Sequence, residues 1–210
     1  MSEHLPQALR SRIKARLRDF SVKTLEVAED QRAAAVAIVV TDTPDKGPAI
    51  IMTRRPMRIG RHPGQYALPG GRIDEGESAN TAARRELSEE LGVDLTPDDE
   101  LGRLDDFATR SGFVISPFIL WGGPGLRLAP EPAEVEKVLL IPFSELDSEA
   151  IPHFQPGYSP DRPVLYSKFP TIGHSMYAPT AAIVYQFREV CLRGQHTRVD
   201  HYDQPKFAWK

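Results

Sequence analysis

Cysteine is almost absent from the 210-residue sequence, which contains only Cys191. A single cysteine cannot form an intramolecular disulfide, and it cannot supply the several thiolates of a structural zinc site. Low cysteine usage is typical of proteins that stay in a reducing compartment. We therefore expect a cytoplasmic protein.

Long apolar runs and an excess of basic charge are also missing. No stretch approaches the roughly 20 apolar residues that span a bilayer, so we expect no stable membrane insertion. The 26 Lys and Arg residues stand against 29 Asp and Glu, which gives a formal net charge of -3. Nucleic acid is therefore not expected as a partner, and an anionic substrate would need local arginines or a metal ion.

The length and the hydrophobic content of 40% are enough for one substantial core. We expect a helical extension over residues 1–30, one α/β domain over 31–194 and a tail over 195–210. The sequence leaves the oligomeric state open, a homodimer included. It contains no internal repeat, heptad array or low-complexity tract.

The N-terminal segment carries an apolar stripe at helical spacing, formed by Leu5, Leu9, Ile13, Leu17 and Phe20. Five basic residues lie between them: Arg10, Arg12, Lys14, Arg16 and Arg18. The pattern is typical of a surface helix docked on a domain, and it also occurs in mitochondrial targeting segments and in helices on membrane surfaces. Asp19 and Glu26 weaken the targeting interpretation.

Apolar periodicity and turn residues predict the main elements of the domain. Buried strands are expected over residues 33–40, 49–53, 114–121 and 135–141, and helices over 78–92 and 179–192. Many prolines and glycines predict a loop over 54–70 and little regular structure over 152–170. The tail is polar, and its pattern predicts no element.

Three carboxylates fall on one side of the first of these helices. Glu86, Glu89 and Glu90 stand at i, i+3 and i+4 spacing, which brings them within one turn. Like charges this close repel one another unless a cation lies between them. A hard divalent cation such as Mg²⁺ or Mn²⁺ prefers oxygen ligands of this kind, whereas an isolated acidic run would more often be a solvated helix face.

The spacing around these glutamates resembles the signature of the Nudix hydrolase family. Gly71 is followed after five residues by Glu77, and after seven more by the run over residues 85–93, with no mismatch to that signature. The resemblance implies a Nudix α/β/α sandwich with a mixed central sheet and, here, an N-terminal helical extension. It also implies metal-dependent attack of water on a diphosphate linkage of a nucleoside diphosphate derivative.

Residue roles follow from the same resemblance. It implies that the metal, Mg²⁺ or Mn²⁺, is held by Gly71, Glu86, Glu89 and Glu90, and that one of these glutamates orients or deprotonates the water. Arg85 and Glu77 are expected to pair and to brace the loop against the helix. Glu134 lies where some Nudix enzymes place a catalytic glutamate outside the signature, although a solvated loop carboxylate is the alternative.

The segment before the signature resembles the extra motif of coenzyme A pyrophosphatases. Matching positions are Thr53, Arg55, Gly64, Pro69, Gly70 and Gly71, whereas Pro56, Gly60 and Leu68 depart from the motif. The substrate predicted on this basis is coenzyme A or acyl-coenzyme A. The alternatives are ADP-ribose or another nucleotide, and a Nudix regulator that binds a nucleotide without hydrolysing it.

Substrate phosphates need cationic or backbone donors close to the signature. The arginines of the preceding loop are candidates, and we expect Arg54, Arg55, Arg61 and Gly70 to bind the substrate. Some of the loop arginines are expected to be ordinary exposed residues. The expected partner is thus a small-molecule nucleotide.

Overall fold

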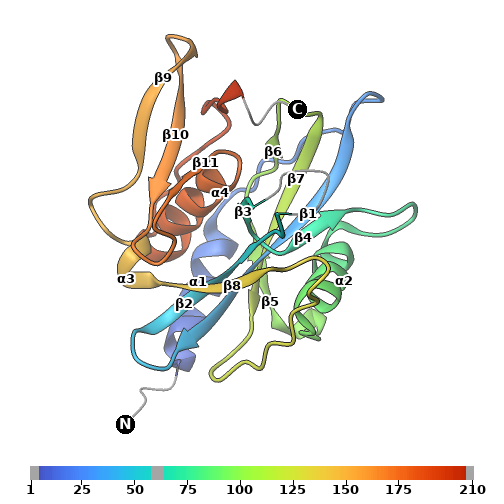
Figure 1. The fold of residues 1–210 in the computed structure, drawn as a ribbon, viewed down its shortest axis with the longest axis vertical. Helices are drawn as coiled ribbons and strands as arrows, with labels where there is room; N and C mark the ends of the chain where they lie inside the picture. Colours follow the sequence, from blue (N-terminus) through green and yellow to red (C-terminus); the bar gives the residue numbers. More distant parts are fainter. Residues whose placement is uncertain (1–4, 58–63, 207–210) are drawn as a thin grey trace.

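The computed structural model describes residues 5–57 and 64–206. Its centre is a mixed sheet of eight strands, whose arrangement Figure 1 shows. The long strands β1 (Arg32–Thr43) and β7 (Phe113–Trp121) run parallel, whereas β2 (Gly47–Arg54) is antiparallel to β1. The other strands are β3 (Tyr66–Ala67), β4 (Gly70–Arg72), β5 (Glu100–Arg103), β6 (Phe107–Ala108) and β8 (Lys137–Pro142).

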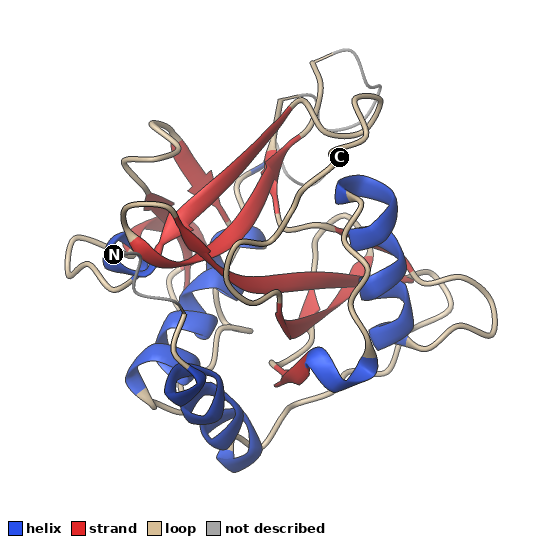
Figure 2. Ribbon diagram, turned by 90° about the horizontal axis from the view of Figure 1, so that it is seen from below, coloured by secondary structure: helices blue, strands red, loops and turns tan. Residues whose placement is uncertain are grey.

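Helices cover both faces of this sheet (Figure 2). Alternate residues of β1 point to opposite faces, so Ala37 and Val39 pack in one cluster with Leu87 of α2 (Ala79–Leu91). Ile38 and Val40 belong to the other cluster, with α1 (Gln7–Asp19) and α4 (Thr180–Phe187). The predicted α/β/α sandwich with a mixed sheet is confirmed.

The N-terminal helix α1 is docked on the domain. It buries Leu9, Ile13 and Leu17, and it contacts β5 and the π-helical segment η2 (Arg188–Arg193) that continues α4. The guanidinium of Arg16 donates to the carbonyl oxygens of Cys191 and Leu192, 2.9 and 2.6 Å away. Within residues 5–57 and 64–206, no helix combines the length and the apolar character needed to cross a membrane.

The helix that carries the glutamates begins and ends where the sequence predicts. Ser78 stands at the N-cap position, and Gly92 ends the helix in the left-handed region at φ 63°. Because glycine has no side chain, it adopts this conformation without steric cost and closes the last turn of the helix. The bounds of α2 therefore agree with the prediction at both ends.

A second, three-stranded sheet lies beside α4, and the sequence does not predict it. It consists of β9 (His153–Ser159), β10 (Arg162–Lys168) and β11 (Ser175–Tyr177), so the expectation of little regular structure over 152–170 is wrong. Pro156 lies on the edge strand β9, and Pro163 lies at a register irregularity of the hairpin. Prolines are tolerated at these positions because they interrupt few ladder hydrogen bonds.

The described part of the C-terminal tail packs onto the domain although it has no helix or long strand. Val199, Tyr202, Asp203 and Gln204 are buried. The amide of Asp203 donates to the carbonyl of Pro163, and its carboxylate pairs with Arg110 at 3.1 Å. Two short elements, η1 (Pro97–Asp99) and α3 (Phe143–Leu146), complete the fold.

Candidate active site

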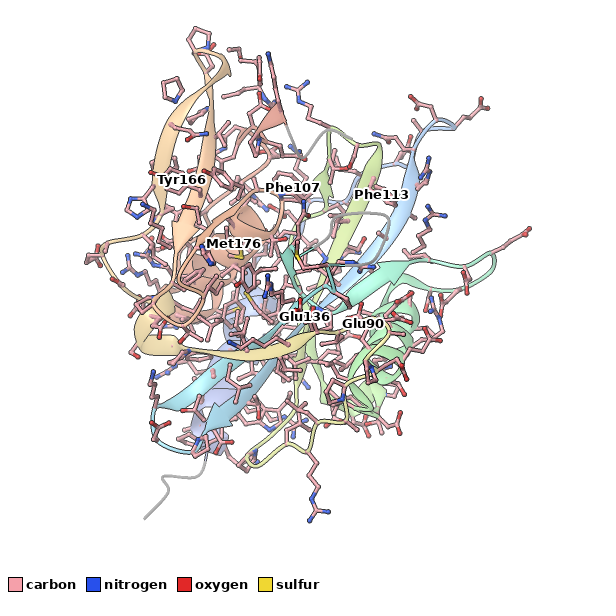
Figure 3. All side chains as sticks on the ribbon, in the orientation of Figure 1. Glu90, Phe107, Phe113, Glu136, Tyr166 and Met176 are labelled. Carbon is pink, nitrogen blue, oxygen red and sulfur yellow. The ribbon has the colours of Figure 1, made fainter. Side chains whose placement is uncertain are left out.

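Glu90 is the most buried acidic group of the candidate site. It lies on α2 beside the sheet, with 4% of its surface exposed (Figure 3). Burial raises the pKa of Glu90 to about 8, and the charges of Glu86 and Glu134 add to this rise, whereas Arg55 and the amide of Gly70 lower it. One carboxylate oxygen, Oε2, has no hydrogen-bond partner. An isolated buried carboxylate is costly, so this atom fits a cation or a proton.

Glu86 lies directly against the backbone of Gly71. A Cβ built on Gly71 would overlap the carboxyl group of Glu86, so no side chain fits at this position. The absence of a side chain therefore allows the carboxylate to reach the strand β4. Burial raises the pKa of Glu86, and the nearby Arg85 opposes this rise.

Arg85 connects the loop before α2 to the helix. Its guanidinium donates two hydrogen bonds of 3.0 Å to the carboxylate of Glu77 and one of 3.0 Å to the carbonyl of Arg72. The remaining nitrogen donates to Glu86 and Glu89, at 2.9 and 3.1 Å. The hydrogen bonds from Arg85 hold the pKa of Glu77 below its ordinary value. The structure thus brings Arg85 and Glu77 together in a bidentate pair.

The other two acidic candidates lie at the edge of the site. The Glu89 side chain is 53% exposed and its carboxylate accepts a hydrogen bond from Arg85. Glu134 is exposed, yet its charge acts on both Glu86 and Glu90. The backbone amide of the nearby Glu131 donates to the carbonyl of Glu90, which attaches this loop to the end of α2.

The predicted substrate-binding residues fall into three groups. The positive charge of Arg55 lowers the pKa of Glu90, as does the backbone amide of Gly70, and the Nε of Arg55 is buried with no hydrogen-bond partner. Arg54 lies farther out, where it pairs with Glu136 at 3.7 Å. Arg61, like its neighbours Arg58 and Gly60, lies outside the described residues.

The groups that could bind a metal are oxygen donors, the type that a hard divalent cation prefers. The candidate ligands are carboxylate oxygens, one of which is orphaned, and the cradle at Gly71 leaves the backbone of β4 accessible. In the described part of the chain, no three acidic, histidine or cysteine side chains converge around one point. Arg85 explains part of this, because it draws the carboxylates of Glu86 and Glu89 toward its guanidinium.

A cavity of about 370 Å³, the site cavity, opens beside these groups. Arg55, Gly70 and Gly71 form the end near the glutamates, and the remaining wall includes Phe113 and Ile183. The volume lies within the range of small-molecule sites. Sequence patterns assign no role to Phe113 or Ile183, because their apolar side chains carry no local sign that distinguishes a cavity wall from the core.

Comparison with known proteins places this architecture in a family. A model of the NUDIX domain matches residues 31–163. NudL of Photorhabdus laumondii, described as an uncharacterized Nudix hydrolase, is 33% identical over 129 residues, which cover 61% of this chain and 68% of NudL. Nudix hydrolase 22, chloroplastic, of Arabidopsis thaliana is 34% identical over 115 residues, covering 53% of this chain and 38% of that protein.

A solved structure shares the fold over most of the chain. The bifunctional NMN adenylyltransferase/ADP ribose pyrophosphatase of Francisella tularensis superposes with a TM-score of 0.53 at 17% identity. The match covers 88% of this chain and 47% of that protein. The fold, the spacing from Gly71 to Val93 and the matched domain together show that the chain belongs to the NUDIX family of hydrolases, which act on phosphorus-containing anhydrides.

Proposed function

We propose that this Nudix hydrolase cleaves the diphosphate linkage of coenzyme A or acyl-coenzyme A, with Mg²⁺ or Mn²⁺ as cofactor. Nudix hydrolases generally use divalent metal ions and act on nucleoside diphosphate derivatives. The specific substrate and the specific metal are parts of the proposal.

The observation that carries the catalytic part of the proposal is the environment of Glu90. A buried carboxylate with an unpartnered oxygen, beside a second carboxylate, weakens the folded state unless a ligand neutralises it. A purely structural role does not require such a group. A solvated acidic helix face is also a poor description, since Glu90 is 4% exposed.

The residues then have separate tasks. Glu86, Glu89, Glu90 and the backbone of Gly71 would hold the cation, and Arg85 with Glu77 would fix the loop against the helix. When bound, the cation supplies positive charge to the diphosphate and lowers the pKa of a water. Arg55, which lines the site cavity and whose charge acts on Glu90, would bind a substrate phosphate. Glu134 would add negative charge near that water and act as a base, a role that its exposure permits.

The choice of coenzyme A depends on the segment before β4. Two residues that match the coenzyme A pyrophosphatase motif lie at the end of β2. Thr53 is paired with Ala67 of β3, and its hydroxyl donates to the Ala67 carbonyl at 3.4 Å, whereas Arg55 follows the last residue of β2. Leu68, which stands in place of the motif's Phe, is buried in the core. The replacement therefore keeps the apolar anchor of the segment.

An assay on a substrate panel tests the proposal. Purified protein is incubated with coenzyme A, acyl-coenzyme A, ADP-ribose, diadenosine polyphosphates and oxidised dGTP, with Mn²⁺ and with EDTA. ADP-ribose is included because the superposed Francisella protein is described as an ADP ribose pyrophosphatase. We expect coenzyme A to be cleaved in the presence of Mn²⁺ and to stay intact in EDTA. A preference for ADP-ribose removes the coenzyme A assignment, and no hydrolysis of any member favours a nucleotide-binding regulator.

A further inference from the structure

A second cavity of about 300 Å³, the side cavity, adjoins the site cavity. Four residues line both cavities, so the two spaces share one wall: Gln65, Tyr66, Pro179 and Thr180. The successive arginines Arg54 and Arg55 line the side cavity and the site cavity, respectively. A molecule with its diphosphate near Arg55 can therefore extend a second part into the side cavity.

The opposite wall of the side cavity comes from a distant part of the chain. His174, Met176 and Tyr177 line it, and they belong to β11 and the turn before it. Met176 of β11 and Tyr166 of β10 are labelled in Figure 3, on the second sheet. These residues lie beyond residue 163, where the match to the NUDIX domain ends. The side cavity is thus built partly from structure outside the matched domain.

Two aromatic rings face each other across this cavity. The rings of Tyr66 and His174 lie 6.5 Å apart between centroids, at an interplanar angle of 29°. The guanidinium of Arg54 lies 5.9 Å from the centre of the Tyr66 ring. A flat ring placed between two others needs about 7 to 8 Å, two layers of van der Waals contact. His174 is exposed, so a small movement of its side chain provides that space.

We propose that the side cavity binds the nucleobase of the substrate, and that the base stacks between the rings of Tyr66 and His174. This inference rests on the proposed cleavage of a diphosphate at the neighbouring Glu86 and Glu90. Aromatic rings and arginine planes bind the π-face of a base, and such stacking accepts different bases. The ligand of the side cavity is therefore a nucleobase, and phosphoanhydrides without a base are poor ligands.

Two non-hydrolysable probes that differ only in the nucleoside test this assignment. α,β-Methylene-ADP carries adenosine on its diphosphonate, whereas methylenediphosphonate carries none. Their binding to the wild-type protein is measured by isothermal titration calorimetry with Mg²⁺. We expect α,β-methylene-ADP to bind at least about tenfold more tightly, which is the scale of one base-stacking contact.

Variants of Tyr66 test whether the difference in affinity between the two probes arises in the side cavity. Tyr66→Leu is expected to lower the affinity for α,β-methylene-ADP about tenfold and to leave the affinity for methylenediphosphonate unchanged. Tyr66→Phe should keep both affinities, because the aromatic ring remains. Tyr158→Leu is the matched control, because Tyr158 is exposed on β9 and lines neither cavity. An unchanged affinity for methylenediphosphonate shows that the variant has folded.

Three results would overturn the assignment. The wild type would bind the two probes equally, Tyr66→Leu would bind α,β-methylene-ADP as tightly as the wild type, or Tyr66→Leu would lose both probes to the same extent. The hydrolysis panel remains an independent test. If no panel member is hydrolysed and Tyr66→Leu still removes the preference for α,β-methylene-ADP, the catalytic proposal fails and the base site stands.

Discussion

Glu77 and Glu90 belong to one sequence signature, yet the structure places them in opposite environments. Glu77 accepts two hydrogen bonds from Arg85 and one from the amide of Asp74, and its pKa is lowered. Glu90 is buried with an unpartnered oxygen, and its pKa is raised to about 8. The difference separates a carboxylate with a full set of partners from one that, in the proposed function, binds the cation.

The largest expected effect follows from removing the negative charge of Glu90. Glu90→Gln keeps the size of the side chain and removes the charge, so we expect turnover to fall at least about a hundredfold, the scale of one lost electrostatic contact in a transition state. In EDTA at neutral pH the free energy of unfolding should rise, because the wild-type protein must keep the buried Glu90 protonated above its ordinary pKa, whereas Gln needs no proton. Hydrolysis assays and urea unfolding measure the two effects.

The control for this variant is Glu75→Gln, in the exposed loop before α2. It should change neither turnover nor stability measurably. If Glu90→Gln unfolds more easily than the wild type in EDTA, Glu90 has a structural partner and the contrast with Glu77 is lost.

A smaller effect is expected from filling the space next to Glu86. In Gly71→Ala the new methyl group would overlap the Glu86 carboxyl group and force it to move. We expect turnover to fall by about ten- to a hundredfold, as for displaced support of a metal site. Steady-state kinetics with a titration of Mn²⁺ measures the loss.

Gly76→Ala is the matched control for that substitution. It adds the same methyl group where no atom lies within 4 Å, at a φ of +78°. It should reduce stability by about 1 kcal/mol through backbone strain and leave turnover unchanged. Equal loss of turnover in both alanine variants would contradict the role given to the Gly71 contact.

Removing the partner of Glu77 should lower stability and activity together. Arg85→Ala deletes the two hydrogen bonds to Glu77 and leaves that carboxylate, whose side chain is 12% exposed, without its cation. We expect a loss of about 1 to 3 kcal/mol in the free energy of unfolding. Arg84→Ala, which breaks a 3.7 Å pair with Glu100, is the control measured in the same urea titration.

Turnover of Arg85→Ala should fall about tenfold, since Arg85 acts through the groups it positions. Stability equal to that of the wild type would show that the Glu77–Arg85 pair does not brace the fold. Loss of turnover as complete as in Glu90→Gln would show that Arg85 contacts the reacting groups.

The smallest expected effect comes from Asp203 in the C-terminal tail, whose pKa is lowered like that of Glu77. Burial alone would raise the pKa of Asp203, but the hydrogen bonds from Arg110 and the Gln204 amide hold it below its ordinary value. The ionised group therefore stabilises the folded protein in full above the ordinary aspartate pKa of 3.8, and this contribution is lost as the pH falls through the lowered pKa.

Asp203→Asn should cost about 1 kcal/mol at neutral pH, because Arg110 is 44% exposed and its charge is screened. The difference from the wild type should shrink below pH 3.8. Urea unfolding at a series of pH values measures it. A difference that stays constant with pH would show that the ion pair contributes nothing.

The part of the chain around the signature could be predicted because its information is local. The bounds of α2 follow from Ser78 and Gly92, and the spacing of Glu86 and Glu90 follows from the helix period. Strand β1 follows from its apolar run. The different burial of Glu89 and Glu90 could not be predicted, because it depends on how α2 is rotated against the sheet.

The C-terminal part depends on contacts between distant residues, so local patterns do not indicate it. Strand β9 is an edge strand whose residues alternate between half-buried and exposed, which removes the apolar signal of a buried strand. The buried Asp203 pairs with Arg110, which is 93 residues away in the sequence. Tyr66 and His174, whose rings face each other, are far apart in the sequence and their pairing needs the folded chain.

The central claim is that Glu90, unlike Glu77, is left for a cation. A titration of the metal-free protein with Mn²⁺, followed by electron paramagnetic resonance, tests it most directly. We predict that the wild type binds Mn²⁺, that Glu77→Gln binds it about tenfold more weakly, and that Glu90→Gln shows no saturable binding in the same range. Binding of Mn²⁺ by Glu90→Gln with wild-type affinity would contradict the claim.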